Sequence, residues 1–378
     1  NIHTLNVLKQ KGFVFEEVRK VTSSKISGKT FVITGTLQQS NRQDFINIIE
    51  QNGGSVTTSI SKNTDFLISG ENPGSKLKKA VELKVEVISE KEILDLINFS
   101  NNFIDEEGNF RKEDLFPDKT VANVFCEPST RTKMSFAVAA GNLGCNVLDF
   151  NIDSSSIQKG ESIYETIDAL NLMGVDLCVL RHPESVIREL SKQLPKMVFI
   201  NAGEGSISHP TQALLDIKTI VDHKSNLDGL KIVIVGDLDH SRVTSSFVEA
   251  VSNFDIEELT FCGHPEMCNK YMDSHFGNYE SDMEKALKDA DVVMTLRIQY
   301  ERFEKDLDLD LETYKNAYQL SSEKLGFAKG DAIIMHPGPV NYIEITEAVY
   351  DCENSVIREQ IANGVAIRMA VLSRFLSS

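Results

Sequence analysis

The segment CEPSTRT at residues 126–132 places three hydroxyls beside one guanidinium. It follows the apolar run 120–125 and precedes a helical pattern, so it is expected where a strand leads into the N-terminus of a helix. Such a terminus gathers unpaired backbone N–H groups and a partial positive charge, and an arginine can bind phosphate through two parallel hydrogen bonds. The segment is therefore predicted to bind phosphate, although Ser and Thr in these positions also serve as ordinary helix caps.

Further polar clusters follow later apolar runs. They comprise Arg181-His182-Pro183, the groups 201–203 and 209–212, the loop 236–242, Arg297 with Gln299, and His336-Pro337-Gly338-Pro339. A lone His or Arg in such a place is usually a cap or a solvated side chain, and Gly236-Asp237 lacks the spacing of a dinucleotide-binding loop. Five clusters at strand ends are harder to explain in that way. Three arginines among them, at 181, 242 and 297, together with Arg131 of the first segment indicate a substrate set with several negative charges.

The elements that must position these residues alternate regularly from residue 119 onward. Eight apolar runs, each typical of a buried strand, are separated by helical patterns; they are 121–125, 146–150, 177–180, 197–200, 231–235, 259–262, 292–296 and 332–335. The pattern predicts an α/β fold of two doubly wound, parallel four-stranded layers joined by a helix at 211–223. The final helix, 355–375, is expected to return to the first layer. The expected domains are 100–224 plus 346–378, which holds the phosphate segment, and 225–345.

Residues 1–99 follow a different pattern. A polar lead-in precedes a strand at 29–35, a helix at 41–51, strands near 55–60 and 65–70, a helix at 75–83, a strand at 85–88 and a helix at 90–99. This order predicts a small, separate α/β module with a short parallel sheet.

The charge distribution also marks a boundary near residue 100. The whole chain of 378 residues carries a net charge of −17, which argues against nucleic acid as its main partner. The first 100 residues hold 13 Lys and Arg against 11 Asp and Glu, a net +2, so the remainder carries −19. No run approaches the roughly 20 apolar residues of a membrane span, and the six cysteines lack zinc-site spacing. We expect a cytoplasmic protein without membrane contact or metal, and its first residue, Asn, suits a fragment or a processed chain.

The N-terminal module resembles BRCT domains, most closely the one that ends bacterial NAD-dependent DNA ligases. The matching strings are SGKTFVITGTL, QNGGSV and SKNTDFLISGENPGSKLKKA. In phosphate-binding members of that family the resemblance implies an anion pocket, here at Thr34, Gly35, Arg42 and Lys76, and a weak contact with DNA ends or with protein. Many BRCT domains serve only as protein contacts, and no Lys-x-Asp-Gly nucleotidyl-transfer motif is present, so the chain is not expected to be a ligase.

Residues 119–378 closely resemble the aspartate carbamoyltransferase family. The strings that carry the resemblance are FCEPSTRTKMSF, SSSIQKGES, VLRHPES, NAGEGSISHPTQALLD, VGDLDHSRV, LRIQYERF, IIMHPGPVN and NGVAIRMAVLSRFL. The ornithine carbamoyltransferases resemble the chain less, because they have His-Pro-Cys-Gln where this chain has His-Pro-Thr-Gln. The helix at 90–99 runs directly into 101–118, so part of the family's N-terminal layer is expected to be missing.

The resemblance implies a role for each cluster. Ser129, Thr130, Arg131 and Thr132 would hold the phosphate of carbamoyl phosphate, and Thr132, Arg181 and His209 would donate to its carbamoyl oxygen. Gln212 and the carbonyls of Pro337 and Gly338 would orient the carbamoyl NH₂. The two carboxylates of aspartate would be held by Arg242, Arg297 and Gln299.

The resemblance also implies a homotrimer with shared sites. Ser155 and Lys159 would reach into the site of a neighbouring subunit, and no cofactor, metal or covalent intermediate would be needed. Two alternatives remain open at this point. One is a docking protein with an inactive carbamoyltransferase half, and the other is a carbamoyltransferase for another amine, such as ornithine.

Overall fold

The chain divides into two compact units, Asn1–Ser89 and Glu90–Ser378. The computed structural model describes residues 30–34, 55–57, 66–69, 90–150, 155–205, 207–274, 276–299 and 310–377. Among these residues, no helix combines the length and the apolar character needed to cross a lipid bilayer.

The described part of the first unit is a three-stranded parallel sheet. Its strands are β1 (Thr30–Thr34), β2 (Ser55–Thr57) and β3 (Phe66–Ser69), arranged in the order β2-β1-β3. The sequence predicts these three strands and their parallel arrangement. The helices predicted at 41–51 and 75–83 and the strand predicted at 85–88 lie outside the described residues.

The second unit begins with a four-stranded parallel sheet in the order β5-β4-β6-β7. Its strands are β4 (Thr120–Phe125), β5 (Asn146–Phe150), β6 (Leu177–His182) and β7 (Val198–Glu204). Three α-helices connect or follow them, α5 (Thr130–Asn142), α6 (Ile163–Leu172) and α7 (Ile187–Gln193). Along β4, Val121 and Phe125 belong to one hydrophobic cluster, and Ala122 and Val124 to another. The sheet is thus buried on both faces, as parallel sheets usually are.

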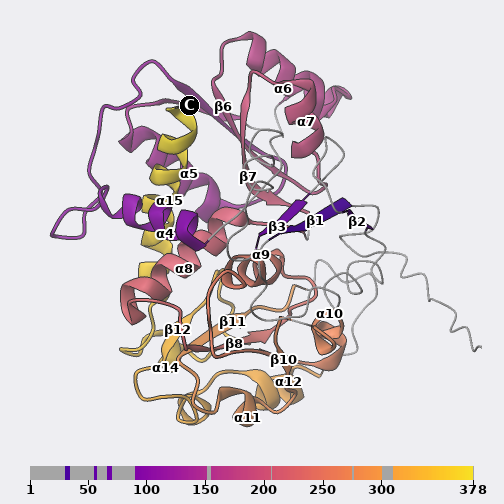
Figure 1. The fold of residues 1–378 in the computed structure, drawn as a ribbon, viewed down its shortest axis with the longest axis vertical. Coiled ribbons are helices and arrows are strands. Elements are labelled where there is room, and N and C mark those ends of the chain that lie inside the picture. The colour runs from indigo at the N-terminus through magenta and orange to yellow at the C-terminus, as the bar shows by residue number, and fades with distance from the viewer. Residues whose placement is uncertain are drawn as a thin grey trace, which may run out of the picture. The chain divides into compact units, whose positions relative to one another are not determined.

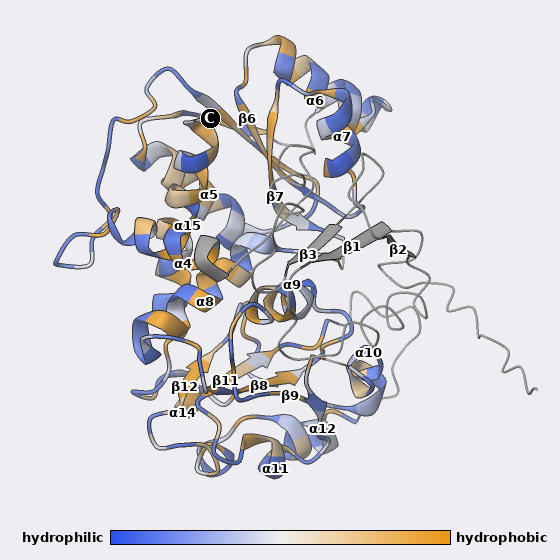
Figure 2. Ribbon diagram, in the orientation of Figure 1, coloured by the Kyte–Doolittle hydropathy of each residue, from blue (hydrophilic) through white to orange (hydrophobic). Residues whose placement is uncertain are grey.

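A second parallel sheet follows, with five strands in the order β10-β9-β8-β11-β12. They are β8 (Lys231–Gly236), β9 (Glu258–Cys262), β10 (Asn278–Tyr279), β11 (Val292–Leu296) and β12 (Ile333–Met335). Four of them match predicted strands, and the two-residue edge strand β10 is additional. Figure 2 shows hydrophobic residues along β8 and β11, and every residue of β11 is buried. The helices around this sheet are α9 (Arg242–Val251), α10 (Asn269–Met272), α11 (Met283–Leu287), α12 (Leu311–Tyr318), α13 (Ser322–Leu325) and α14 (Glu347–Tyr350).

Two helices, α8 and α15, connect the two halves of the second unit, and a third, α4, packs on both of them. α8 (Pro210–Lys224) packs on β7 of the first sheet and on α9 of the second half, and α15 (Ile357–Leu376) packs on α5, α8 and β12 (Figure 1). α4 (Glu90–Asn101) packs on α15 and α8 and buries Ile93 and Ile97. The carboxyl ends of β4 and β6 carry segment 126–132 and Arg181, so the predicted site residues lie where these helices bring the sheets together.

Gly236 ends β8 at a place where no side chain fits. Its φ is +129°, and a Cβ atom there would overlap the carbonyl oxygen of Leu296 on the paired strand β11. We predict that Gly236→Ala lowers the unfolding temperature markedly, because a positive φ alone costs about 1–3 kcal/mol and the clash with backbone adds to it. The matched control is Gly229→Ala, which has φ +70° but nothing within 4 Å of the added atom. Equal losses for the two variants, measured by thermal unfolding, would show that the contact with Leu296 is unimportant.

Candidate active site

Segment 126–132 leads from β4 into α5, as the sequence predicts. Ser129 precedes the helix in extended conformation (φ −161°, ψ 93°), and its side chain makes no hydrogen bond that caps the helix. Thr130 and Arg131 are exposed, whereas Thr132 is buried with 6% of its surface accessible. The hydroxyl of Ser129 is therefore not used by an ordinary cap, and the helix N-terminus with its arginine can receive an anion.

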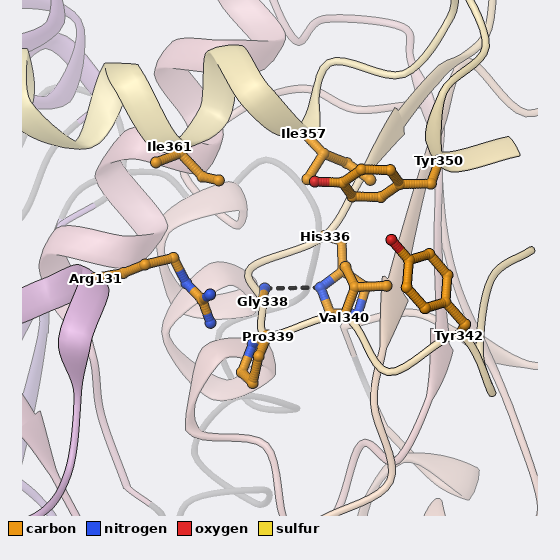
Figure 3. Close-up of a pocket in the computed structure, with 9 residues that line it drawn as sticks. All are labelled: Arg131, His336, Gly338, Pro339, Val340, Tyr342, Tyr350, Ile357 and Ile361. Atoms are coloured by element: carbon orange, nitrogen blue, oxygen red, sulfur yellow. Dashed lines mark hydrogen bonds between the residues drawn. The ribbon is translucent and has the colours of Figure 1, made fainter. Parts of the chain in front are cut away.

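Arg131 extends from α5 to the loop that follows β12, where its guanidinium lies against Gly338 (Figure 3). A Cβ atom at Gly338 would stand 2.7 Å from Cζ of Arg131, and the glycine has φ +69°, so a larger residue here would be strained and would displace the guanidinium. A pocket of about 240 Å³ lies beside the pair. Burial lowers the pKa of Arg131, Tyr350 raises it, and the positive charge of Arg297 lowers it. The charge of Arg297 thus acts on the predicted phosphate site.

Glu127 connects arginines from both halves of the unit. Its Oε2 atom lies 2.6 Å from Nη2 of Arg242, at the start of α9, and 3.3 Å from Nε of Arg181, near the end of β6. Arg242 is only 5% exposed. Gly203 lies against both guanidiniums, since a Cβ atom there would stand 3.0 Å from Nη1 of Arg242 and 3.1 Å from Nη1 of Arg181. One carboxylate therefore neutralises part of a buried double positive charge.

His209 lies at the N-terminus of α8 and is 4% exposed. Its Nε2 atom is 3.4 Å from Oγ1 of Thr132, and its backbone N–H donates to Oγ of Ser246. Burial lowers the pKa of His209 well below its ordinary value, and the charges of Arg368, Arg181 and Arg242 lower it further. The imidazole is therefore neutral at neutral pH. A neutral ring can donate one N–H to a substrate oxygen without adding another buried charge.

Gln212, one turn further along α8, takes part in a buried amide and carboxylate cluster. Its Nε2 donates to Oδ1 of Asp216 over 2.8 Å, and Nε2 of Gln360 from α15 donates to the same oxygen over 2.7 Å. Asp216 is fully buried. Burial raises the pKa of Asp216 to about 7, although both hydrogen bonds and the charge of Arg368 act in the opposite direction.

His336 and Glu344 hold the loop that contains Pro337 and Gly338. Both side chains are 1% exposed, and Nε2 of His336 is 2.8 Å from Oε1 of Glu344. Nδ1 of His336 accepts a hydrogen bond from the backbone N–H of Gly338 over 2.7 Å (Figure 3), so the ring proton lies on Nε2 and is donated to Glu344. The backbone N–H of His336 donates to Oε1 of Gln360 over 2.9 Å, which connects the loop to the Asp216 cluster.

Arg297 and Gln299 follow β11, as predicted. Nη1 of Arg297 donates to the carbonyl of Ile298 over 3.1 Å. Gln299 is held by two hydrogen bonds, from its N–H to Oδ2 of the buried Asp237 and from its Nε2 to the carbonyl of His240. Asp237 also lies 2.8 Å from Nδ1 of His240, so it organises the loop that leads to Arg242.

The remaining predicted residues are not brought into this cluster. Ser155 precedes the short helix η2 (Ser156–Lys159), and Lys159 is exposed. Their predicted role in a neighbouring subunit stays a prediction. In the first unit Thr34 ends β1, and the other residues of the predicted anion pocket lie outside the described residues: Gly35, Arg42 and Lys76.

Sequence reasoning missed four acidic or amide residues that support the site: Glu127, Asp216, Glu344 and Gln360. Glu127 could have been found, because an acid inside a predicted anion-binding segment must have a cationic partner. The other three gave no comparable signal. Asp216 and Gln360 are 144 residues apart in sequence, and each is an ordinary helix residue until the fold brings them together.

Three sequence-family models match this chain, two in residues 82–375 and one in the N-terminal part. The model described as "Aspartate/ornithine carbamoyltransferase, carbamoyl-P binding domain" matches residues 82–222, and the one described as "Aspartate/ornithine carbamoyltransferase, Asp/Orn binding domain" matches residues 228–375. A BRCT model matches residues 21–97. The N-terminal part is thus a BRCT domain, and the first and third matches overlap at 82–97, where α4 begins.

Individual relatives are similar over most of their length. The aspartate carbamoyltransferase catalytic subunit of Dehalococcoides mccartyi is 41% identical over 299 residues, which cover 74% of this chain and 90% of that protein. The catalytic subunit of Coxiella burnetii is 40% identical, with coverage of 78% and 95%.

Two solved structures are similar in fold. The catalytic subunit of M. jannaschii aspartate transcarbamoylase has a TM-score of 0.67 and 34% identity, with coverage of 77% of this chain and 95% of that chain. The Trypanosoma cruzi enzyme in complex with carbamoyl aspartate and phosphate has a TM-score of 0.66 and 28% identity, with coverage of 75% and 92%.

The raised pKa of Asp216 generates a pH-dependent prediction. The folded chain favours the neutral carboxyl of Asp216. The contribution of this group to the free energy of unfolding is therefore fully present below about pH 4 and is lost as the pH rises through about 7. Asp216→Asn does not titrate, so the unfolding temperature of the native chain should fall relative to that of the variant between these pH values.

The control is Asp331→Asn. Lys224 lowers the pKa of the exposed Asp331, so any effect of that substitution should be small and should have the opposite pH dependence. A difference between the native chain and Asp216→Asn that stays constant from pH 4 to 8 would contradict the raised pKa.

Proposed function

This chain belongs to the aspartate/ornithine carbamoyltransferase family, and we propose how its residues transfer the carbamoyl group of carbamoyl phosphate to the amine of L-aspartate. The products are N-carbamoyl-L-aspartate and phosphate, the reaction used in pyrimidine biosynthesis. The observation that carries the residue assignment is the convergence of Arg131, Arg181, Arg242 and His209 on the ends of β4 and β6. These side chains come from both halves of the second unit, and the carboxylate of Glu127 joins Arg181 to Arg242.

Carbamoyl phosphate binds with its phosphate at the N-terminus of α5. Ser129, Thr130, Arg131 and Thr132 supply hydroxyls, backbone N–H groups and one guanidinium, and Arg181 adds positive charge. The contact of Arg131 with Gly338 supports this role, because it holds the guanidinium beside the loop expected to contact the carbamoyl group.

The carbonyl oxygen of carbamoyl phosphate then lies toward Thr132, Arg181 and His209. As the aspartate amine attacks the carbonyl carbon, negative charge develops on this oxygen and these donors stabilise it. The low pKa of His209 supports the assignment, because a neutral ring at this position donates a hydrogen bond rather than acting as a general acid. The bond between the carbonyl carbon and the phosphate oxygen breaks, and the departing phosphate accepts the proton of the amine.

Aspartate is held by Arg242, Arg297 and Gln299. Two guanidiniums match two carboxylates, and the hydrogen bonds of Gln299 to Asp237 and His240 keep that side chain in place. With both substrates fixed, the reaction proceeds through positioning and electrostatic stabilisation.

The test is steady-state release of phosphate from carbamoyl phosphate with and without aspartate. We expect turnover that depends on aspartate, and a fall in kcat of about 10²- to 10³-fold for His209→Ala, the usual loss when one oxyanion donor is removed. His223→Ala, an exposed histidine at the far end of the same helix, is the matched control and should retain full activity. Turnover with ornithine but not with aspartate would refute the assigned acceptor.

The exposed position of Lys159 supports a proposal about the oligomeric state, because an exposed side chain can reach the site of another subunit. We propose a homotrimer in which residues 155–159 complete the site of a neighbour. Arg131→Ala and Lys159→Ala chains should each be nearly inactive alone. Mixed after dissociation, they should regain activity, because roughly a quarter of the sites would then carry neither substitution. The measurements are phosphate release and the oligomeric mass of the mixture. Shared sites would be contradicted if the mixture formed trimers but remained inactive.

A further inference from the structure

A continuous buried hydrogen-bonded chain connects Gln212 on α8 with the loop at Pro337 and Gly338. Its links are Gln212 to Asp216, Asp216 to Gln360, Gln360 to the N–H of His336, and His336 to both Gly338 and Glu344. Every heavy-atom distance in it lies between 2.7 and 2.9 Å. The chain thus ends, on both sides, at groups to which the family resemblance gives a role in orienting the carbamoyl NH₂.

The carboxyl group of Asp216 determines which atom donates in each of its two hydrogen bonds. Oδ1 of a carboxyl group accepts hydrogen bonds, and it still accepts if the group carries a proton on Oδ2. Both amides must therefore turn their NH₂ toward Asp216. The Oε1 atom of Gln212, at the other end of that amide, is then offered as an acceptor away from Asp216.

The orientation of the Gln360 amide, fixed by Asp216, also determines which atom it presents to the loop. With its NH₂ directed to Asp216, Gln360 presents Oε1 to the backbone N–H of His336. Glu344 fixes the proton of His336 on Nε2, so Nδ1 accepts from the N–H of Gly338.

The geometry of the Pro337–Gly338 peptide then orients a second acceptor. This peptide bond is trans in the structure. In a trans peptide the carbonyl points opposite to the N–H. The carbonyl of Pro337 therefore points away from His336, while the Gly338 N–H is used within the loop (Figure 3).

We propose that Asp216, with Gln360 as its link to the loop, is a positioning residue that makes the site select an NH₂ group on the acyl carbon of the substrate. It does so by presenting acceptors, the Oε1 of Gln212 and the carbonyl of Pro337, to two N–H donors. An acyl phosphate with a methyl group in place of NH₂ would leave both acceptors unpaired, and the one on Gln212 belongs to a buried side chain. A site built around hydrogen bonds discriminates against such a ligand. The inference rests on the proposed function.

The experiment compares Asp216→Leu with Asp216→Asn. Leucine removes the acceptor, so the amide of Gln212 can present either end to the substrate. Asparagine keeps an oxygen at the Oδ1 position that can accept from both glutamines. For each chain we would measure the KM for carbamoyl phosphate and the inhibition constant of acetyl phosphate, which carries methyl where carbamoyl phosphate carries NH₂.

We expect the preference for carbamoyl phosphate over acetyl phosphate to fall by about tenfold in Asp216→Leu, the effect of one lost hydrogen bond, and to be largely restored in Asp216→Asn. Equal weakening of both ligands would indicate a merely structural role and would overturn the inference. So would an unchanged preference in Asp216→Leu.

Gln360→Met provides a second test should Asp216→Leu fail to fold. It keeps the side-chain volume but breaks the link to His336, and we expect the preference to fall at least threefold, or about 0.7 kcal/mol. An unchanged preference would again overturn the inference. Loss of aspartate-dependent turnover in the native chain would refute the proposed function instead, so the two failures are distinguishable.

Discussion

The site depends on one carboxylate placed between two arginines. Arg242 is almost fully buried and Arg181 nearly so, and two such charges without a counter-ion would repel each other in a medium of low dielectric constant. Glu127 makes their approach possible, and it brings together the end of the first sheet and the start of α9 in the second half. The two arginines are therefore held together by a residue of the chain itself. Anionic substrates then meet a positive field that Glu127 reduces but does not cancel, because one carboxylate faces two guanidiniums.

The same low dielectric constant explains why His209, which lies near these arginines, carries no charge. The pKa of His209 is lowered by burial and by three guanidiniums, so the ring stays neutral. Arg368 lies with its Cζ 5.0 Å from the ring centre of Phe136, and burial lowers its pKa to about 10. Nearby polar contacts are made by amides and hydroxyls, which provide direction without net charge. The interior thus separates two tasks, since arginines supply attraction for anions and the chain through Asp216 supplies orientation.

Much of this fold is readable from the sequence for a simple reason. Strands buried on both faces, such as Val292–Leu296, must be continuous apolar runs, and the polar residues at their carboxyl ends stand out against them. Arg131, Arg181, Arg242 and Arg297 were found in this way. The edge strand Asn278–Tyr279 has too few residues to show a period. Asp216 and Gln360 stayed hidden because their role depends on a contact across 144 residues, which local patterns do not encode.

The helix α4 shows how a BRCT domain and a carbamoyltransferase can be joined without an added linker. Both family matches include residues 90–97, and in the structure these residues form a helix that packs on α8 and α15. Ile93 and Ile97 are nearly inaccessible there, and Lys218 of α8 donates to Oδ1 of Asn101 at the helix end. α15 needs such cover because it is buried along most of its length and carries Gln360. The helix that both family matches share thus packs on the element whose first turn carries Gln360, a member of the hydrogen-bonded chain.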